Sequence, residues 1–200
     1  MRRSATETRE HVLQVAHDLF YWHGVRATGI DRVAAAAEVT TTTLYRLFPS
    51  KDDLVAAYVH RADQWTREGF DATIEAAGPH PRDQILAAFD AHTEQMRPER
   101  FRGCVCMMAL AEFPDPALPA HQHAVMAKTW LRTTLRELTR RLAATTPIED
   151  PAALADRLYL VMEGAKAATQ ALGADGPAEQ ARPLVEAILD APTAVRPGPA

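Results

Sequence analysis

The chain has 200 residues, of which 47% are hydrophobic and 24% are charged. This composition is typical of a globular protein with a sizeable core, and it disfavours a disordered or fibrous chain. No apolar run approaches the roughly 20 residues of a membrane-spanning helix, and no apolar signal segment follows the N-terminus. We therefore expect a cytoplasmic protein without a membrane partner.

The formal net charge is -4, which argues weakly against a protein that coats nucleic acid through bulk charge. Residues 1–60 carry seven basic and seven acidic side chains, so this part of the chain has no net charge. Any DNA binding here must depend on the geometry of individual contacts. The two cysteines, Cys104 and Cys106, are too close in sequence to staple a secreted scaffold, and we expect reduced thiols.

Helical periodicity covers almost every segment, and no window shows the alternation of a β-strand. Capping residues, glycines and prolines divide this pattern into about nine helices. The predicted helices begin near Thr6, Thr28, Thr40, Ser50, Ile85, Gly103, Pro119, Asp150 and Pro177. The predicted fold is all-α, with a three-helix N-terminal domain (residues 1–50), a helical body (51–192) and a disordered tail (193–200).

The second and third predicted helices have the pattern of a helix-turn-helix, whose second helix lies in the major groove of DNA. On that second helix, Val39, Leu44 and Phe48 are expected to face inward. The other side chains are short, polar or basic, as contacts to base edges and phosphates require: Thr41, Thr42, Thr43, Tyr45 and Arg46. Thr40 or Thr41 caps this helix, and its free N-terminal amides suit a phosphate. The alternative interpretation is a solvated polar helix edge.

Residues 6–54 resemble the DNA-binding head of TetR-family transcriptional repressors. The resemblance rests on residues at matching offsets: Phe20, Gly24, Thr28, Ile30, Val33, Ala34, Ala37, Val39, Thr43, Leu44, Tyr45, Phe48, Ser50, Lys51 and Leu54. One departure is Glu38, where the family usually has glycine in the turn. This departure predicts a strained or slightly altered turn.

The resemblance implies a set of DNA contacts within this head. Phosphate contacts are implied for Thr28, Tyr45 and Lys51, and base or phosphate contacts for Thr41, Thr42 and Arg46. The flanking hydroxyls of Thr40 and Thr43 complete the predicted DNA-binding set. Arg2, Arg3 and Arg9 either reach into the minor groove or form a solvated basic end. Because the family binds as dimers, the expected target is a near-palindromic double-stranded operator with half-sites about 34–36 Å apart.

The resemblance also implies a C-terminal body that binds a small-molecule effector and forms the dimer. Composition suggests the pocket walls, which combine aromatic, sulfur-containing and polar side chains. The candidate effector-binding residues are Trp65, Phe89, His92, Met96, Cys104, Met107, Met108, Trp130, Tyr159, Met162 and Glu163. For any one of them a place in the core is the simpler interpretation, and His92 is either a ligand contact or a hydrogen-bonded core histidine. The expected effector is largely hydrophobic.

Cys104 and Cys106 suggest an alternative, a thiol- or metal-responsive regulator with His121 and His123 as further metal ligands. Their spacing matches no common zinc motif, so packing thiols are the simpler interpretation and no metal or cofactor is expected. Residues 152–173 and 177–190, which are rich in alanine and leucine, are expected to form the homodimer as a four-helix bundle.

The sequence thus predicts a ligand-responsive DNA-binding regulator, most simply a repressor whose dimer leaves its operator when the effector binds. A helix-turn-helix that mediates only protein contacts is one alternative. An α-helical enzyme is another, but the sequence shows no Ser-His-Asp order, nucleophile elbow, phosphate loop or metal pair. We therefore do not expect an enzyme.

Overall fold

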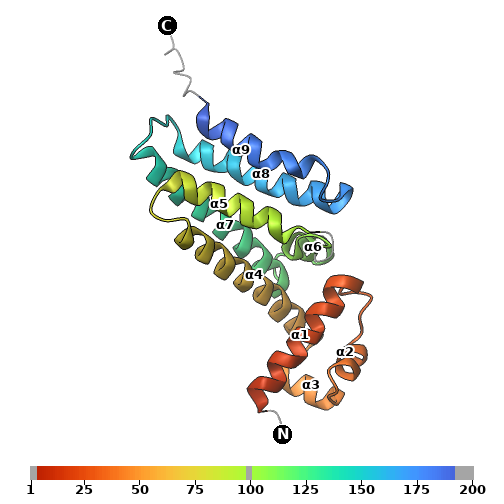
Figure 1. Ribbon diagram of the computed structural model, residues 1–200. Coiled ribbons are helices and arrows are strands. Elements are labelled where there is room, and N and C mark those ends of the chain that lie inside the picture. Colours follow the sequence, from red (N-terminus) through yellow and green to blue (C-terminus); the bar gives the residue numbers. More distant parts are fainter. Residues whose placement is uncertain (1–3, 98–100, 192–200) are drawn as a thin grey trace. The chain divides into compact units, whose positions relative to one another are not determined.

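A computed structural model describes residues 4–97 and 101–191 of the chain (Figure 1). Within these residues the fold is all-α, as predicted, with nine α-helices, one short 3-10 helix and no strand. The helices are α1 (Ala5–His23), α2 (Ile30–Ala36), α3 (Thr41–Leu47), α4 (Lys51–Ala76), α5 (Pro81–Gln95), α6 (Val105–Glu112), α7 (Pro119–Ala143), α8 (Pro151–Leu172) and α9 (Ala181–Asp190). The predicted disordered tail (193–200), Arg2 and Arg3 lie outside the described residues.

The described chain divides into two compact units. The first unit comprises the chain up to Trp65 together with Val105–Ala127, and the second comprises Thr66–Cys104 together with the chain from Lys128 onward. This division differs from the predicted boundary after residue 50. Helix α4 begins directly after the predicted boundary, but its residues up to Trp65 belong to the first unit, which α6 and the start of α7 also join.

In the first unit, local sequence signals determine where the helices begin and end. Helix α1 starts in a capping box, in which the Ser4 hydroxyl accepts from the Glu7 N–H and the Glu7 carboxylate accepts from the Ser4 N–H. It ends at Gly24, whose φ of 86° is easily reached only without a side chain. At the start of α4, the Ser50 hydroxyl accepts from the Asp53 N–H and so caps this helix.

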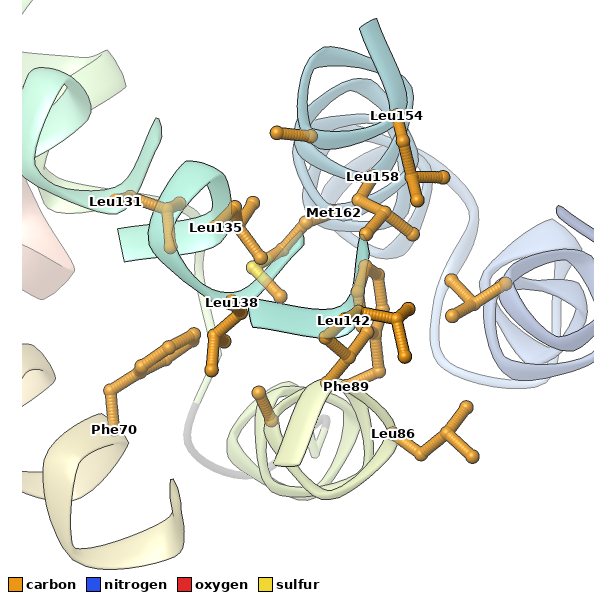
Figure 2. Packing of buried hydrophobic residues seen from close by; sticks show 14 residues of the cluster. Phe70, Leu86, Phe89, Leu131, Leu135, Leu138, Leu142, Leu154, Leu158 and Met162 are labelled. Atoms are coloured by element: carbon orange, nitrogen blue, oxygen red, sulfur yellow. The ribbon is translucent and has the colours of Figure 1, made fainter. Parts of the chain in front are cut away.

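In the second unit, side chains from α4, α5, α7 and α8 meet in one apolar core (Figure 2). The leucines of α7 follow the three-four spacing of a single helix face. These residues are Leu131, Leu135, Leu138 and Leu142. Phe89 of α5 and Leu158 of α8 are fully buried in the same cluster, and Val185 of α9 joins it. The core therefore holds α5, α8 and α9 together with the parts of α4 and α7 that belong to this unit.

The predicted ninth helix from Pro177 is wrong in one respect, because it is divided. Pro177–Gln180 forms a 3-10 turn, and only Ala181–Asp190 is α-helical. Pro183 explains this break, since it has no N–H to continue an α-helical hydrogen-bond ladder back into the preceding turn. The start of α8 is confirmed, with Asp150 as N-cap and Pro151 at the first position. None of the helices in the described ranges is both long and apolar enough to span a membrane.

Candidate functional site

Helices α2 and α3 are short and are joined by a tight turn. The turn is closed by backbone bonds, because the Ala37 N–H donates to Val33 and the Val39 N–H donates to Ala34. Glu38 lies between them with a φ of 55°, in the left-handed region. The strained turn predicted from this residue is therefore confirmed in the backbone.

The inward face of α3 carries the apolar residues expected there. Leu44 and Phe48 are buried, as predicted, and Val39 is half-buried. The guanidinium of Arg9 lies 4.7 Å from the centre of the Phe48 ring and 3.6 Å from the Glu10 carboxylate. The contact of Arg9 with Phe48 joins α1 to the end of α3, whose opposite face is exposed.

The threonine run divides into residues that build the helix and residues that face outward. Thr40 is the N-cap, as predicted, and its hydroxyl accepts from the Thr43 N–H at 3.1 Å and donates to the Thr43 hydroxyl at 2.9 Å. The Thr41 hydroxyl donates to the Asp31 carboxylate on α2 at 3.1 Å. Thr42 is exposed. The hydroxyls of Thr40, Thr41 and Thr43 therefore set the start and orientation of α3.

Three exposed side chains of α3 make no polar contact with the described part of the chain. They are Thr42, Tyr45 and Arg46, and Tyr45 is 46% exposed. Lys51, at the first position of α4, is half-buried and likewise has no polar partner within the described residues. Each of these groups is free to bind another molecule.

Thr28 is placed differently from the expectation. It does not cap α2, whose N-cap is Gly29 without a side-chain hydrogen bond. Its side chain is 0% exposed, and its hydroxyl donates to the Gly24 carbonyl at 2.9 Å. The hydroxyl therefore ties the end of α1 to the start of α2, and it is not available to a phosphate.

The second unit holds a cluster of ionic side chains, which we call the polar cluster: Cys104, Lys128, Glu163 and Lys166. The Glu163 carboxylate accepts from Lys128 Nζ at 2.5 Å and from Lys166 Nζ at 3.0 Å. Lys128 Nζ also donates to Cys104 Sγ at 3.3 Å. Burial alone would raise the pKa of Glu163, but the two ammonium groups outweigh it and hold the pKa below its ordinary value. Glu163 is thus an anion between two cations.

His92 lies on α5, one turn from Phe89 and one turn from Met96, which pack in the apolar clusters against α8. Its Nε2 atom is buried and has no hydrogen-bond partner in the described part of the chain. Burial, and then the ammonium groups of Lys166 and Lys128, keep the pKa of His92 well below 6.5. His92 is therefore a neutral, unsatisfied polar group inside the unit, not the hydrogen-bonded core histidine of the sequence-based interpretation.

Two family models match the chain. Residues 12–58 match the model of bacterial regulatory proteins of the tetR family, and residues 81–185 match the tetracyclin repressor-like C-terminal domain. The chain belongs to the TetR family.

Individual relatives agree with this assignment over nearly the full chain. The crystal structure of SCO4454, a TetR-family transcriptional regulator from Streptomyces coelicolor, is 34% identical with a TM-score of 0.84 and covers 92% of this chain and 95% of that chain. A TetR transcriptional regulator from Chloroflexus aurantiacus is 29% identical with a TM-score of 0.80, covering 94% and 98%. The HTH-type transcriptional regulator YjdC of Escherichia coli is 28% identical over 185 residues, covering 90% and 93%.

The TetR assignment confirms the predicted class of function. The chain is a DNA-binding transcriptional regulator and not an enzyme. Regulators of this family bind DNA, form dimers and respond to effector ligands. The helix-turn-helix of the first unit is the DNA-binding element of the family.

The structure places the predicted effector residues of this TetR regulator in different surroundings. Phe89, Met96 and Met162 are core residues of the second unit, and Trp130 packs edge-on against Phe70 at 5.6 Å between ring centres. Tyr159 is half-buried on α8. Three of the predicted residues belong to the first unit instead: Trp65, Met107 and Met108. Only Cys104 and Glu163 join the polar cluster.

Trp65 packs within the first unit. Its ring lies 5.1 Å from that of His17, and the Arg61 guanidinium lies 4.5 Å from its centre. Two residues of the polar cluster, Lys128 and Lys166, are not among the residues predicted from the sequence. A signal was present, because the chain has only three lysines and these two interrupt runs of small and apolar residues.

Proposed function

We propose that this TetR regulator is an effector-responsive repressor that binds a near-palindromic operator as a homodimer through the exposed face of α3. The observation that carries the proposal is the set of exposed α3 side chains without polar partners in the described chain, Thr42, Tyr45 and Arg46. The second helix of a helix-turn-helix enters the major groove, so such side chains meet base edges and phosphates.

The three side chains support different kinds of contact. A guanidinium such as that of Arg46 forms two parallel hydrogen bonds to guanine or pairs with a phosphate. The Thr42 hydroxyl and methyl suit base edges, including the thymine methyl. The Tyr45 hydroxyl and the Lys51 ammonium suit phosphates, which fix the register on the duplex. Thr40, Thr41 and Thr43 act on DNA through the position of the helix, because their hydroxyls are already bonded.

The test compares two arginines that differ in position but not in charge. Arg46→Ala should weaken binding to DNA that contains the operator by about tenfold or more, because a lost base or phosphate pair is worth about 1–3 kcal/mol. Arg140→Ala, which removes an exposed arginine of the second unit, is the control. The operator is first selected from random duplexes, and affinity is measured by fluorescence anisotropy. Equal affinities of the two variants would exclude α3 as the reading element.

The proposed dimer surface is formed by α8 and α9, as the sequence predicts. Leu160 and Leu172 of α8 are 69% and 67% exposed, and Leu184 of α9 is also exposed. Gly164 lies on the exposed face of α8, and a Cβ there would meet nothing within 4 Å. Exposed leucines on neighbouring helices, with a small residue that allows close approach, support a four-helix bundle made from two helices of each protomer.

The proposed effector site is in the second unit, at the polar cluster and His92. Ionic and unsatisfied polar groups within an apolar core are costly, and they are commonly retained where a ligand uses them. An effector that binds one conformation of the dimer better than another shifts the population toward it. We propose that the favoured conformation binds the operator less tightly.

A further inference from the structure

The polar cluster has an uneven charge. Lys128 and Lys166 contribute two positive charges, whereas Glu163 contributes one negative charge. With Cys104, which Lys128 also contacts, as a neutral thiol, the cluster has a surplus positive charge. The side chains of the two lysines are only 14% and 12% exposed. A largely buried charge without a counter-charge is unfavourable, so the cluster has room for one more anion.

The two ammonium groups also have hydrogen-bond donors to spare. Each ammonium has three N–H groups. Lys128 uses one on Glu163 and one on Cys104, and Lys166 uses one on Glu163. Neither lysine makes a further polar contact with the described residues. Three N–H groups therefore remain for an acceptor, and a carboxylate accepts more than one of them.

A second observation, independent of the lysines, also indicates a ligand. The Nε2 atom of His92 on α5 and the hydroxyl of Thr169 on α8 are both buried without hydrogen-bond partners in the described chain. Met96 and Ala165 pack in one cluster, and Phe89 and Met162 pack in another. His92 lies between Phe89 and Met96 in sequence, and the ammonium groups of Lys166 and Lys128 are close enough to help lower its pKa.

The surroundings of these polar groups are apolar. Met96 and Ala165 form a buried cluster to which Phe101 and Val161 contribute. On the other side of His92, Phe89 and Met162 belong to the main core of the unit. A ligand here needs an apolar body of modest size and one anionic group, as small-molecule sites usually combine apolar walls with a few placed polar groups.

We propose that the effector is an apolar carboxylic acid, bound as its carboxylate by Lys128 and Lys166 with His92 as a further hydrogen-bonding group. This inference rests on the proposed function, because it names the chemical class of the effector that releases the operator. The carboxylate supplies the missing negative charge and accepts the unused N–H groups. The carbon skeleton lies among the apolar residues around His92.

The experiment uses matched probes on the full chain. The carboxylates are hexanoate, octanoate, benzoate and phenylacetate, and each is compared with the alcohol of the same skeleton. Binding is measured by thermal shift and calorimetry, and operator release by anisotropy. At least one carboxylate should bind about tenfold or more tightly than its alcohol and weaken operator binding. The proposal is overturned if none of the four carboxylates binds, or if an alcohol binds as well as its acid.

Three variants test the charge argument with opposite signs. Lys166→Met makes the cluster neutral and should abolish carboxylate binding, whereas Glu163→Gln raises the surplus to two and should strengthen it. Arg132→Met removes an exposed arginine one turn further along α7 and should leave carboxylate binding unchanged. Carboxylate binding that survives Lys166→Met, or that weakens in a folded Glu163→Gln protein, contradicts the proposal. If Glu163→Gln does not fold, the comparison of Lys166→Met with Arg132→Met decides.

The proposed repressor function and the proposed class of effector can each fail without the other. If the ligand-free protein does not bind its selected operator, the proposed repressor function fails, while carboxylate binding by calorimetry still tests the site. If operator binding holds and no carboxylate binds, only the chemical class of the effector is wrong. If a carboxylate binds but the operator is not released, the proposed carboxylate site is correct and its role as the effector site is wrong.

Discussion

Replacing Glu38 with glycine should stabilise the protein without changing how α3 is presented. Glu38 has a φ of 55°, in a region that costs an L-residue roughly 1–2 kcal/mol because Cβ approaches the backbone oxygen. Its side chain is exposed and makes no polar contact with the described chain. The glutamate therefore contributes strain to the turn with no compensating hydrogen bond.

Two opposing effects determine how much Glu38→Gly changes the free energy of unfolding. Glycine removes the strain, but it also gives the unfolded chain more freedom, which costs about 0.4–1 kcal/mol. The net gain in the free energy of unfolding should be about 0.5–1 kcal/mol. For a chain of this size, that gain corresponds to an increase in Tm of about 1–4 °C.

The matched control is Glu38→Ala, which removes the same carboxylate but keeps the Cβ and hence the strain. Thermal unfolding of both variants is followed by calorimetry, and operator affinity by anisotropy. Glu38→Gly should unfold at a higher temperature than Glu38→Ala, and the two should bind the operator equally, because both lose one negative charge. The strain argument is refuted if Glu38→Gly is no more stable than Glu38→Ala.

The remaining predictions concern a helix cap, a buried histidine and the dimer. Thr40→Ala should lower the free energy of unfolding by about 1 kcal/mol and Thr40→Ser should not, as urea denaturation can show. Burial, then the two ammonium groups, lower the pKa of His92 in the folded state, so its contribution is present above the unfolded value near 6.5 and is lost as pH falls. His92→Gln should therefore reduce the loss of stability between about pH 7.5 and pH 5 by up to about 2 kcal/mol, and an unchanged slope would contradict this. Leu160→Asp should give monomers in sedimentation experiments, whereas Thr133→Asp on an exposed position of α7 should not; a dimeric Leu160→Asp protein would exclude this face.

The sequence was sufficient where structure depends on near neighbours. The apolar spacing that places Leu44 and Phe48 inward is a property of one helix, and Thr40 caps the residues directly after it. The same holds for Asp150 and the proline that follows it at the start of α8. Each of these features is decided within about one helical turn, so the residue pattern determines it.

The sequence was insufficient where a side chain meets a partner far along the chain. The segment around Glu112 joins the first unit, where its carboxylate and carbonyl accept from Arg26 at 3.2 and 2.9 Å. Lys128 of α7 and Glu163 of α8 form a hydrogen bond although they are 35 residues apart in the sequence. Periodicity identifies the buried face of a helix but not the helix that covers it. The sequence marks the two lysines of the polar cluster as unusual, but only the three-dimensional structure shows that they meet Glu163.

The charged groups of the first unit also indicate that DNA binding depends on the geometry of individual contacts. Half of its described arginine and lysine side chains are already engaged within the unit: Arg9 with Glu10 and Phe48, Arg26 with Glu112, and Arg61 with Glu10 and Trp65. Only Arg32, Arg46 and Lys51 have no such partner among the described residues. Few phosphates can then be neutralised by each protomer, so bulk attraction contributes little to affinity. In the proposed dimer, operator recognition then depends on how accurately the two copies of α3 are held, and the proposed effector would act by changing how they are held.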